Sequence, residues 1–199
     1  TMHQSSLGSV LLIMGSKLSP LWYTIWLPLL FLISALAMGY GVVMLEATLV
    51  NRAFKTPSEA RLFARLARVV AGLLAGYLLL RWGDLAYRGY LGLAFAGDWD
   101  GNLFLIETVL FLVPLFVLVS HRRTSQRWQF LAAVSLLAGG SLYRLNAYLM
   151  AVRPGNGWTY FPSAPELMIT IGVICLEIML YLLFIKTLPV LHGAHQAQP

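Results

Sequence analysis

The chain has 199 residues, of which 59% are hydrophobic and only 11% are charged. A soluble domain averages roughly 45–50% apolar and about 25% charged residues, so a soluble core of this size would not bury the apolar excess. The net charge of +6 is better explained by Lys and Arg in loops that flank a membrane than by a nucleic-acid-binding surface. Cys175 is the single cysteine, which excludes an intrachain disulfide and a cysteine-ligated iron–sulfur cluster.

The N-terminal residues Thr1 to Ser6 contain no basic segment followed by an apolar one, so they do not form a signal peptide. They also do not resemble a natural start, and we expect an earlier part of the protein to precede them. We assign residues 1–20 to an outer, periplasmic segment. Within it, His3 is expected in a Ser- and Gln-rich surface loop, where a lone histidine is ordinarily only a solvated side chain.

Five apolar segments follow, at residues 21–50, 60–88, 102–120, 127–150 and 165–187. Each is long enough to cross the hydrocarbon core, which takes about 20 helical residues. The sequence therefore predicts an all-α membrane protein with a bundle of five transmembrane helices at residues 21–188.

The first segment would be about 45 Å long as a helix, so it must tilt or protrude, and Pro28 is a candidate for a kink. In the second, Gly72 and Gly76 either let a neighbouring helix approach closely or are simply tolerated there.

Lys and Arg set the predicted orientation. If every segment spans, three basic clusters fall on one side: residues 52–68, residues 121–127 and Lys186. The loops near 89–101 and 151–164, which are rich in turn residues, fall on the other side with no comparable basic excess. By the positive-inside rule, the basic side is cytoplasmic. We therefore expect a multi-pass protein of the bacterial inner membrane, with a cytoplasmic tail at residues 189–199.

Two acidic residues interrupt the apolar segments. Glu46 lies about one turn from the cytoplasmic end of the first helix. Ionisable groups inside membrane spans are costly and point to function, and Glu46 suits a proton relay. The alternatives are a structural hydrogen bond to a neighbouring helix or snorkelling toward the cytoplasmic surface. Glu177, in the middle of the last helix, serves either a proton path or a contact with a neighbouring helix.

A set of polar residues lies near the outer ends of three helices. It consists of Tyr77, Arg81, Asp84 and Arg88 in the second helix, Glu107 in the third, and Arg144, Asn146 and Tyr148 in the fourth. In such a layer, Arg81 and Arg144 can neutralise Asp84 and Glu107. The layer is either a buried ion-pair lock that fixes helix packing or a binding site for a polar headgroup such as a quinone ring.

The histidines bear on whether a haem is bound. His3, His121, His192 and His195 all lie outside the apolar segments. A transmembrane b-type haem commonly needs two axial histidines within the spans, so we expect this chain alone to hold none. The sequence also has no GxxxxGK[ST] phosphate-binding loop and no HExxH zinc motif, and it predicts no metal site.

Several short motifs carry a family resemblance. They are residues 1–9 (TMHQSSLGS), 18–22 (LSPLW), 46–50 (EATLV), 81–88 (RWGDLAYR), 93–98 (LAFAGD), 143–145 (YRL) and 160–162 (YFP), together with Glu166. In this order they resemble the HybB-type, nickel–iron hydrogenase branch of the NrfD/PsrC family of quinone-interacting membrane anchors. The resemblance covers essentially the whole chain but only the C-terminal part of a family protein.

This resemblance implies part of the membrane subunit of a respiratory nickel–iron hydrogenase. An iron–sulfur subunit would dock on the outer face and pass electrons from the nickel–iron catalytic subunit to menaquinone or ubiquinone. The resemblance implies no haem in this chain, and it assigns His3 and Glu46 to proton transfer or quinone chemistry. Earlier helices of the same subunit would complete the site.

Two alternatives to this interpretation remain open. The first is a membrane anchor of another reductase of the same family. The second is a non-redox transporter or channel, in which Glu46, Glu177 and the outer polar layer form the polar route.

Overall fold

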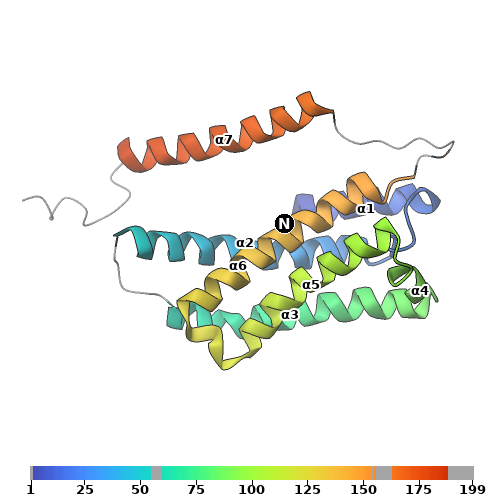
Figure 1. Ribbon diagram of the computed structural model, residues 1–199, viewed down its shortest axis with the longest axis horizontal. Helices are drawn as coiled ribbons and strands as arrows, with labels where there is room; N and C mark the ends of the chain where they lie inside the picture. The colour runs from blue at the N-terminus through green and yellow to red at the C-terminus, as the bar shows by residue number, and fades with distance from the viewer. Residues whose placement is uncertain (1, 55–59, 154, 156–162, 188–199) are drawn as a thin grey trace, which may run out of the picture. The chain divides into compact units, whose positions relative to one another are not determined.

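The computed structural model describes residues 2–54, 60–153, 155 and 163–187, and the chain forms two units, residues 1–159 and 160–199. The described residues are helical and form no β-strand (Figure 1). The helices are α1 (Met2–Met14), α2 (Leu27–Phe54), α3 (Ala60–Tyr87), α4 (Leu91–Ala94), α5 (Trp99–Val119), α6 (Gln126–Leu145) and α7 (Ala164–Thr187). Short 3-10 turns lie at Gly15–Lys17 and His121–Thr124, and a π turn at Asn146–Met150 continues α6.

Among the described residues, four helices are long and apolar enough to cross a membrane. They are α2, α3, α5 and α7, over residues 27–51, 63–87, 99–119 and 164–184. The predicted all-α membrane bundle is therefore confirmed. The prediction of five spans also counted α6, which is less apolar because it contains Arg127, Gln129 and Arg144. Its 20 residues nevertheless cover about 30 Å.

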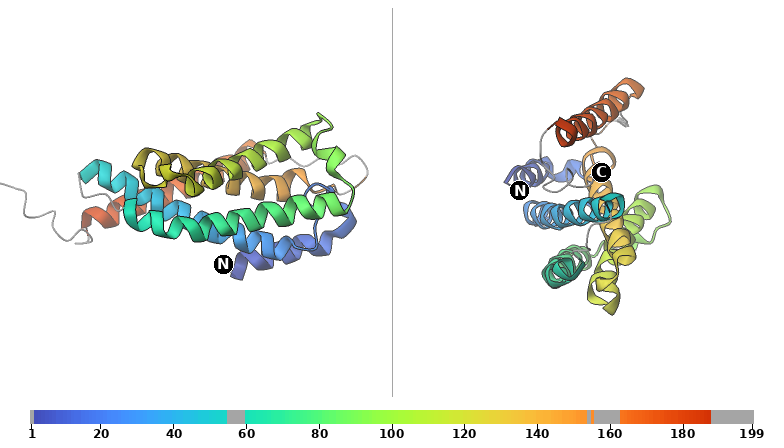
Figure 2. Two further views of the ribbon diagram at one scale, coloured as in Figure 1. Left: turned by 90° about the horizontal axis from the view of Figure 1, so that it is seen from below. Right: turned by 90° about the vertical axis from the view of Figure 1, so that its left-hand side faces the viewer.

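Helices α2, α3, α5 and α6 form an antiparallel bundle. Each contacts two neighbours, in the order α2, α3, α5, α6 and back to α2, and Figure 2 shows this arrangement along the bundle axis. Short connections between consecutive helices are typical of such up-and-down bundles. Large aromatic side chains, including Phe31, Tyr77, Phe104, Phe111 and Tyr143, fill the interior and are almost completely buried.

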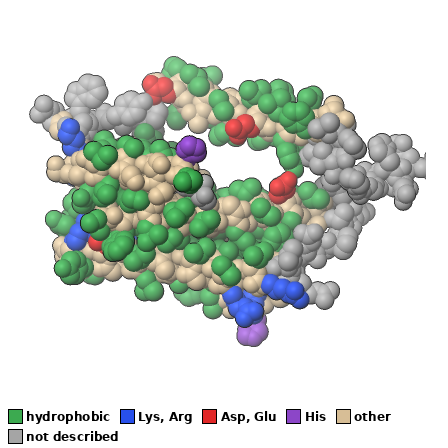
Figure 3. All heavy atoms as spheres, turned by 180° about the vertical axis from the view of Figure 1, so that it is seen from behind, with side chains coloured by type: hydrophobic (Ala, Val, Ile, Leu, Met, Phe, Trp, Pro, Cys, Tyr) green, Lys and Arg blue, Asp and Glu red, His purple; other side chains and the backbone are tan. Residues whose placement is uncertain are grey.

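The two ends of this bundle differ in charge. We call the end at which α3 finishes and α5 begins the Trp99 end, and the opposite end the Arg122 end. The charged residues near the Trp99 end are Lys17, Asp84, Arg88, Asp98, Asp100 and Arg153; those toward the Arg122 end are Glu46, Arg65, Arg68, Arg122, Arg123 and Arg127. In Figure 3, the surface between the ends shows mainly hydrophobic side chains and uncharged tan atoms, and the blue side chains lie near the ends.

The segment before α2 differs from the sequence-based expectation. Residues 2–14 form a helix, so the prediction that His3 lies in a loop was wrong. Gly8 of α1 lies against the backbone of Leu27 and Pro28, close enough that an added Cβ would be 2.8 Å from either residue. Because α1 contacts the start of α2 here and the two helices run in opposite directions, the residues around His3 lie beside later turns of α2.

The structure also decides the roles of prolines and glycines that the sequence left open. Helix α2 begins at Leu27 rather than residue 21, which places Pro28 in its first turn, where a missing N–H is tolerated. Pro114 lies inside α5 and cannot donate to the carbonyl of Leu110, but Ser135 of α6 donates its hydroxyl to that oxygen at 2.9 Å. Gly72 and Gly76 of α3 have no described neighbour within 4 Å of a Cβ position, so they do not mark a close helix contact there.

Helix α7 is the described part of the second unit. The Glu166 carboxylate in its first turn accepts the backbone N–H of Ser163 at 3.2 Å, half of a capping box that satisfies a free donor at the helix start. Cys175 and Glu177 follow further along the helix. The predicted cytoplasmic tail at residues 189–199 lies outside the described residues.

Candidate functional site

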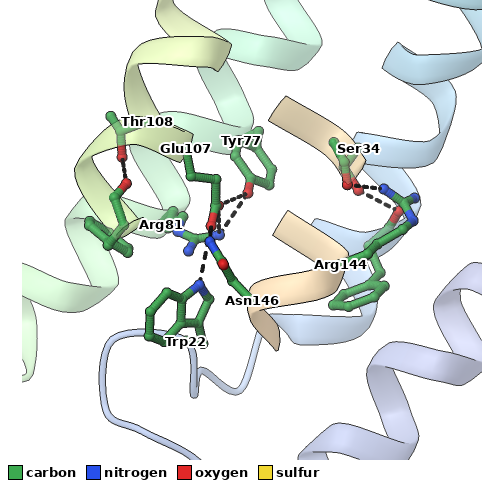
Figure 4. Close-up of polar contacts among 11 residues, drawn as sticks. Trp22, Ser34, Tyr77, Arg81, Glu107, Thr108, Arg144 and Asn146 are labelled. Carbon is green, nitrogen blue, oxygen red and sulfur yellow. Dashed lines mark hydrogen bonds and ion pairs between the residues drawn. The ribbon is translucent and has the colours of Figure 1, made fainter. Parts of the chain in front are cut away.

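The polar centre of the bundle is the carboxylate of Glu107, which is 1% exposed. Arg81 lies 2.8 Å from its Oε1 atom and forms an ion pair with it. Trp22 Nε1 and Asn146 Nδ2 donate to Oε2 at 3.2 and 3.1 Å, and the Tyr77 hydroxyl lies 3.4 Å from Oε1. Figure 4 shows these side chains converging on one point. Together these four partners satisfy a carboxylate that would be very costly to bury alone.

Four segments that are distant in sequence build this buried network. Tyr77 and Arg81 are four residues apart on α3, so they share one face of the helix. Glu107 lies in the third turn of α5, and Trp22 comes from the segment before α2. Asn146 is the first residue of the π turn that follows α6, and this wider turn is a frequent feature of functional positions.

The guanidinium of Arg81 lies between two aromatic rings. Its Cζ atom is 4.7 Å from the ring centres of both Phe104 and Tyr143, and its Nη1 donates to the Tyr77 hydroxyl at 2.7 Å. Arg81 Nε and Nη2 and the Tyr143 hydroxyl are buried without a protein partner. The arginine is therefore held by one carboxylate, one phenol and two ring faces, and it retains unused donors.

A small cavity lies beside Arg81. Its volume is about 10 Å³, and Trp22, Asp84 and Arg88 contribute to its lining. This is close to the smallest volume that holds one water molecule, which would pair with one of the unused donors. A quinone ring does not fit, so the interior around Glu107 supports the structural alternative for this pair over a headgroup site.

Asp84 and Arg144, which were also predicted to belong to the polar layer, do not join this network. Asp84 forms its ion pair with Arg88 at 2.7 Å, not with Arg81 or Arg144 as expected. Arg144 forms no ion pair with a carboxylate of the described residues. Instead it donates to the Gln4 side chain at 3.0 Å, to the carbonyl of Gly140 at 2.8 Å and to the sulfur of Met38 at 2.9 Å. Arg144 therefore links α6 to α1 and α2.

The two residues assigned to proton transfer lie away from the buried network. His3 is on α1 and Glu46 is on α2, and both side chains are exposed at the surface of the first unit. The structure therefore does not bring either residue to the Arg81–Glu107 pair. Their roles, and those of the other predicted site residues, stay predictions.

Sequence reasoning did not assign a role to several members of the network. Trp22 and Tyr143 appeared only within family motifs, and Asn146 only as one polar residue of the outer layer. The available signal was a set of large aromatic and amide side chains near the ends of apolar segments. Such groups need a hydrogen-bond partner when buried, but the sequence does not show that the partner is Glu107.

The described residues offer no cluster of three His, Cys, Asp or Glu side chains that would hold a metal ion. They also do not fit a haem with two histidine ligands. His3 lies on α1 and His121 lies in the 3-10 turn at the Arg122 end, and both are exposed. His192 and His195 are outside the described residues.

Comparison with known proteins identifies the family. Residues 6–151 match the family described as "Polysulphide reductase, NrfD", a stretch that includes the whole buried network. The chain belongs to the NrfD family. It is 42% identical to the "Probable Ni/Fe-hydrogenase 2 b-type cytochrome subunit" of Escherichia coli (strain K12), over 99% of this chain and 53% of that protein.

A second relative of this NrfD-family chain comes from Nitratidesulfovibrio vulgaris. The identity is 29%, over 96% of the chain and 52% of the relative. The chain thus spans about half the length of both curated relatives. No solved structure matches the chain.

Proposed function

We propose that the chain is the C-terminal part of the membrane subunit of a respiratory nickel–iron hydrogenase. In this role it helps to pass electrons from an iron–sulfur partner subunit to membrane quinone, with coupled proton transfer. The observation that carries the proposal is the 42% identity to the Escherichia coli hydrogenase-2 subunit, maintained over 99% of the chain. The name of the matched family supports a second candidate, the anchor of another reductase such as a polysulphide reductase.

The proposed chemistry needs protons as well as electrons. Oxidation of hydrogen releases two electrons and two protons, and reduction of a quinone to a quinol takes up two of each. Within an apolar bundle, protons must be passed along titratable side chains. We assign this role to Glu46, and to His3 because histidine both accepts and donates protons near neutral pH. The exposure of both side chains supports the assignment, because a quinone or further helices can reach them.

The proposed arrangement in the membrane follows the charge difference between the bundle ends. We place the protein in the inner membrane of a bacterium. Its basic Arg122 end and its C-terminus then face the cytoplasm. The iron–sulfur subunit, and through it the nickel–iron subunit, then docks at the Trp99 end. Menaquinone or ubiquinone is the substrate, and the remaining helices of the same subunit complete its site.

We also propose that the intact subunit binds no haem through this part of the chain, although the Escherichia coli relative is named a b-type cytochrome subunit. His3 and His121 do not form a pair inside the bundle. A pyridine haemochrome assay on the intact subunit should give no signal. A stoichiometric b-type haem that is lost when His3 or His121 is replaced would contradict this proposal.

The proposed function is tested in the intact complex by two activities. Hydrogen oxidation with an artificial dye reports on the catalytic subunit, whereas hydrogen-dependent quinone reduction also requires the membrane subunit. Glu46→Gln keeps the shape of the side chain but cannot titrate, so quinone reduction should fall at least tenfold while dye reduction stays near the wild-type rate. His3→Ala should behave in the same way. Glu166→Gln, which alters a carboxylate with no assigned proton role, should leave both activities unchanged.

Two results would contradict parts of this proposal. If Glu46→Gln and His3→Ala both reduce quinone at the wild-type rate, the two residues do not carry protons. If the intact subunit purifies with an iron–sulfur subunit whose catalytic partner contains no nickel, the complex is another reductase rather than a hydrogenase.

A further inference from the structure

A second polar cavity lies at the Trp99 end and is separate from the buried network around Glu107. Its volume is about 450 Å³, and its walls come from residues 15–23, from Arg88 and Tyr90 just after α3, and from Arg153. The donors that line it include Ser16, Tyr23, Arg88, Tyr90 and Arg153. None of the described residues that line it is an Asp or a Glu. We call it the Arg88–Arg153 pocket.

Backbone hydrogen bonds join two of the walls. Leu18 and Val152 form an isolated antiparallel bridge. The N–H of Arg153 donates to the carbonyl of Lys17 at 2.7 Å, and the N–H of Ser19 donates to the carbonyl of Ala151 at 2.7 Å. The residues that follow α1 are therefore fixed against those that follow α6, and the pocket between them is preformed.

The two arginines are held in place by groups behind them. Arg88 Nε forms an ion pair with Asp84 at 2.7 Å, and its Nη1 donates to the carbonyl of Pro20 at 3.2 Å. Arg153 forms an ion pair with Asp100. Each guanidinium carries five N–H donors, so both have donors left after these contacts. Neither carboxylate is among the described lining residues, so the pocket offers a ligand the remaining N–H donors of two ion-paired guanidiniums.

Aromatic side chains place the pocket at the level of lipid headgroups. Trp26, Tyr87, Tyr90 and Trp99 at this end of the bundle are 42–91% exposed. Exposed Trp and Tyr side chains at the end of a membrane helix mark the interface between the hydrocarbon and water. A molecule that enters the pocket from the bilayer therefore presents its polar headgroup to the two arginines.

We propose that the Arg88–Arg153 pocket binds the phosphodiester headgroup of an anionic phospholipid. A phosphodiester accepts several hydrogen bonds and carries a negative charge, which matches two oriented guanidiniums with phenol and hydroxyl donors beside them. A quinone ring is also an acceptor but is neutral, so it gains less from two cations. Basic pockets between membrane helices on the cytoplasmic or matrix side bind anionic lipid headgroups, and we extend this mode of recognition to the Trp99 end. This inference does not depend on the hydrogenase assignment.

Native mass spectrometry of the detergent-purified intact complex tests the proposal. After delipidation, phosphatidylglycerol should bind at one site more tightly than phosphatidylcholine, which has the same acyl chains. Arg153→Gln should weaken this binding roughly tenfold, the effect expected from losing one charge-assisted hydrogen bond. Arg88→Gln should do the same. Arg127→Gln, an equal change of charge at the Arg122 end, should have no effect.

Several outcomes would overturn the proposal. If Arg153→Gln binds phosphatidylglycerol as tightly as the wild type does, the proposed site does not exist. The Arg153 side chain is exposed, so this variant should fold and remains a valid test even if Arg88→Gln fails to assemble. Equal binding of phosphatidylcholine would rule out recognition of the anionic headgroup. Displacement of the lipid by millimolar inorganic phosphate would identify a site for free phosphate, and displacement by a neutral quinone analogue would identify a quinone site.

Discussion

At the residue scale, the Arg81–Glu107 ion pair is the central polar contact of the bundle interior. Both side chains are buried, so replacing Glu107 by Gln leaves a guanidinium without its counter-charge. We expect this variant to lose about 3–5 kcal/mol of stability, seen as a lower melting temperature in detergent and reduced abundance in the membrane. Arg81→Gln should be similarly harmful. The double variant removes both charges and should recover part of the loss, giving a coupling energy of about 1–3 kcal/mol.

The Asp84–Arg88 pair offers a comparison: its side chains are 12% and 21% exposed, against 2% and 6% for Glu107 and Arg81, so Asp84→Asn should cost less than Glu107→Gln. If Glu107→Gln has the same melting temperature as the wild type, the Arg81–Glu107 pair does not stabilise the helix packing. Normal abundance combined with lost quinone reduction would instead indicate a direct role of the pair at the quinone.

Two buried tyrosines of the same core should respond differently to loss of the hydroxyl. Tyr77 accepts a hydrogen bond from Arg81 at 2.7 Å, so Tyr77→Phe should lower stability by about 1–3 kcal/mol. The Tyr143 hydroxyl has no protein partner, so Tyr143→Phe should be neutral or slightly stabilising. Thermal melting of the two variants in the same detergent measures the difference. A larger loss in Tyr143→Phe would show that a buried water satisfies its hydroxyl.

At the scale of elements, a hydrogen bond from α6 compensates for a missing backbone donor in α5. Pro114 removes the N–H that would otherwise reach Leu110, and the hydroxyl of Ser135 takes its place. Ser135→Ala should leave a buried carbonyl unpaired and lower stability by about 1–3 kcal/mol. The same substitution in a Pro114→Ala background should cost less, because alanine at this position restores the backbone donor. Equal costs in both backgrounds, measured by thermal melting, would show that the two residues are independent.

At the scale of the whole molecule, the antiparallel bundle predicts which connections share a side of the membrane. Reporter fusions after residues 55 and 124 should give a cytoplasmic signal, as should a fusion at the C-terminus. Fusions near residues 98 and 156 should report the opposite side. The physical reason is the excess of Arg around the α2–α3 and α5–α6 connections. A cytoplasmic signal at residue 98 would rule out this topology.

Apolar length alone was enough to predict most of the helices. The segments at 60–88, 102–120, 127–150 and 165–187 correspond to α3, α5, α6 with its π turn, and α7, because the bilayer requires long helices that satisfy their own backbone. The helix α1 was missed, since its polar first turns resemble a loop in sequence. The irregular stretch before Leu27 was missed because its residues are as apolar as those of the helix that follows.

The sequence by itself determined the class of protein, the approximate helix positions and the family resemblance, because these depend on composition and local order along the chain. Only the tertiary structure decided which charges meet. Arg81, Asp84 and Arg88 are close in sequence, yet Arg81 pairs with Glu107 on another helix and Arg88 pairs with Asp84. Which partner a charge takes depends on how α3 is rotated against α5, and that rotation is set by the fit of buried side chains such as Tyr77, Phe104 and Phe111. The preformed Arg88–Arg153 pocket likewise arises only where the residues after α1 meet those after α6.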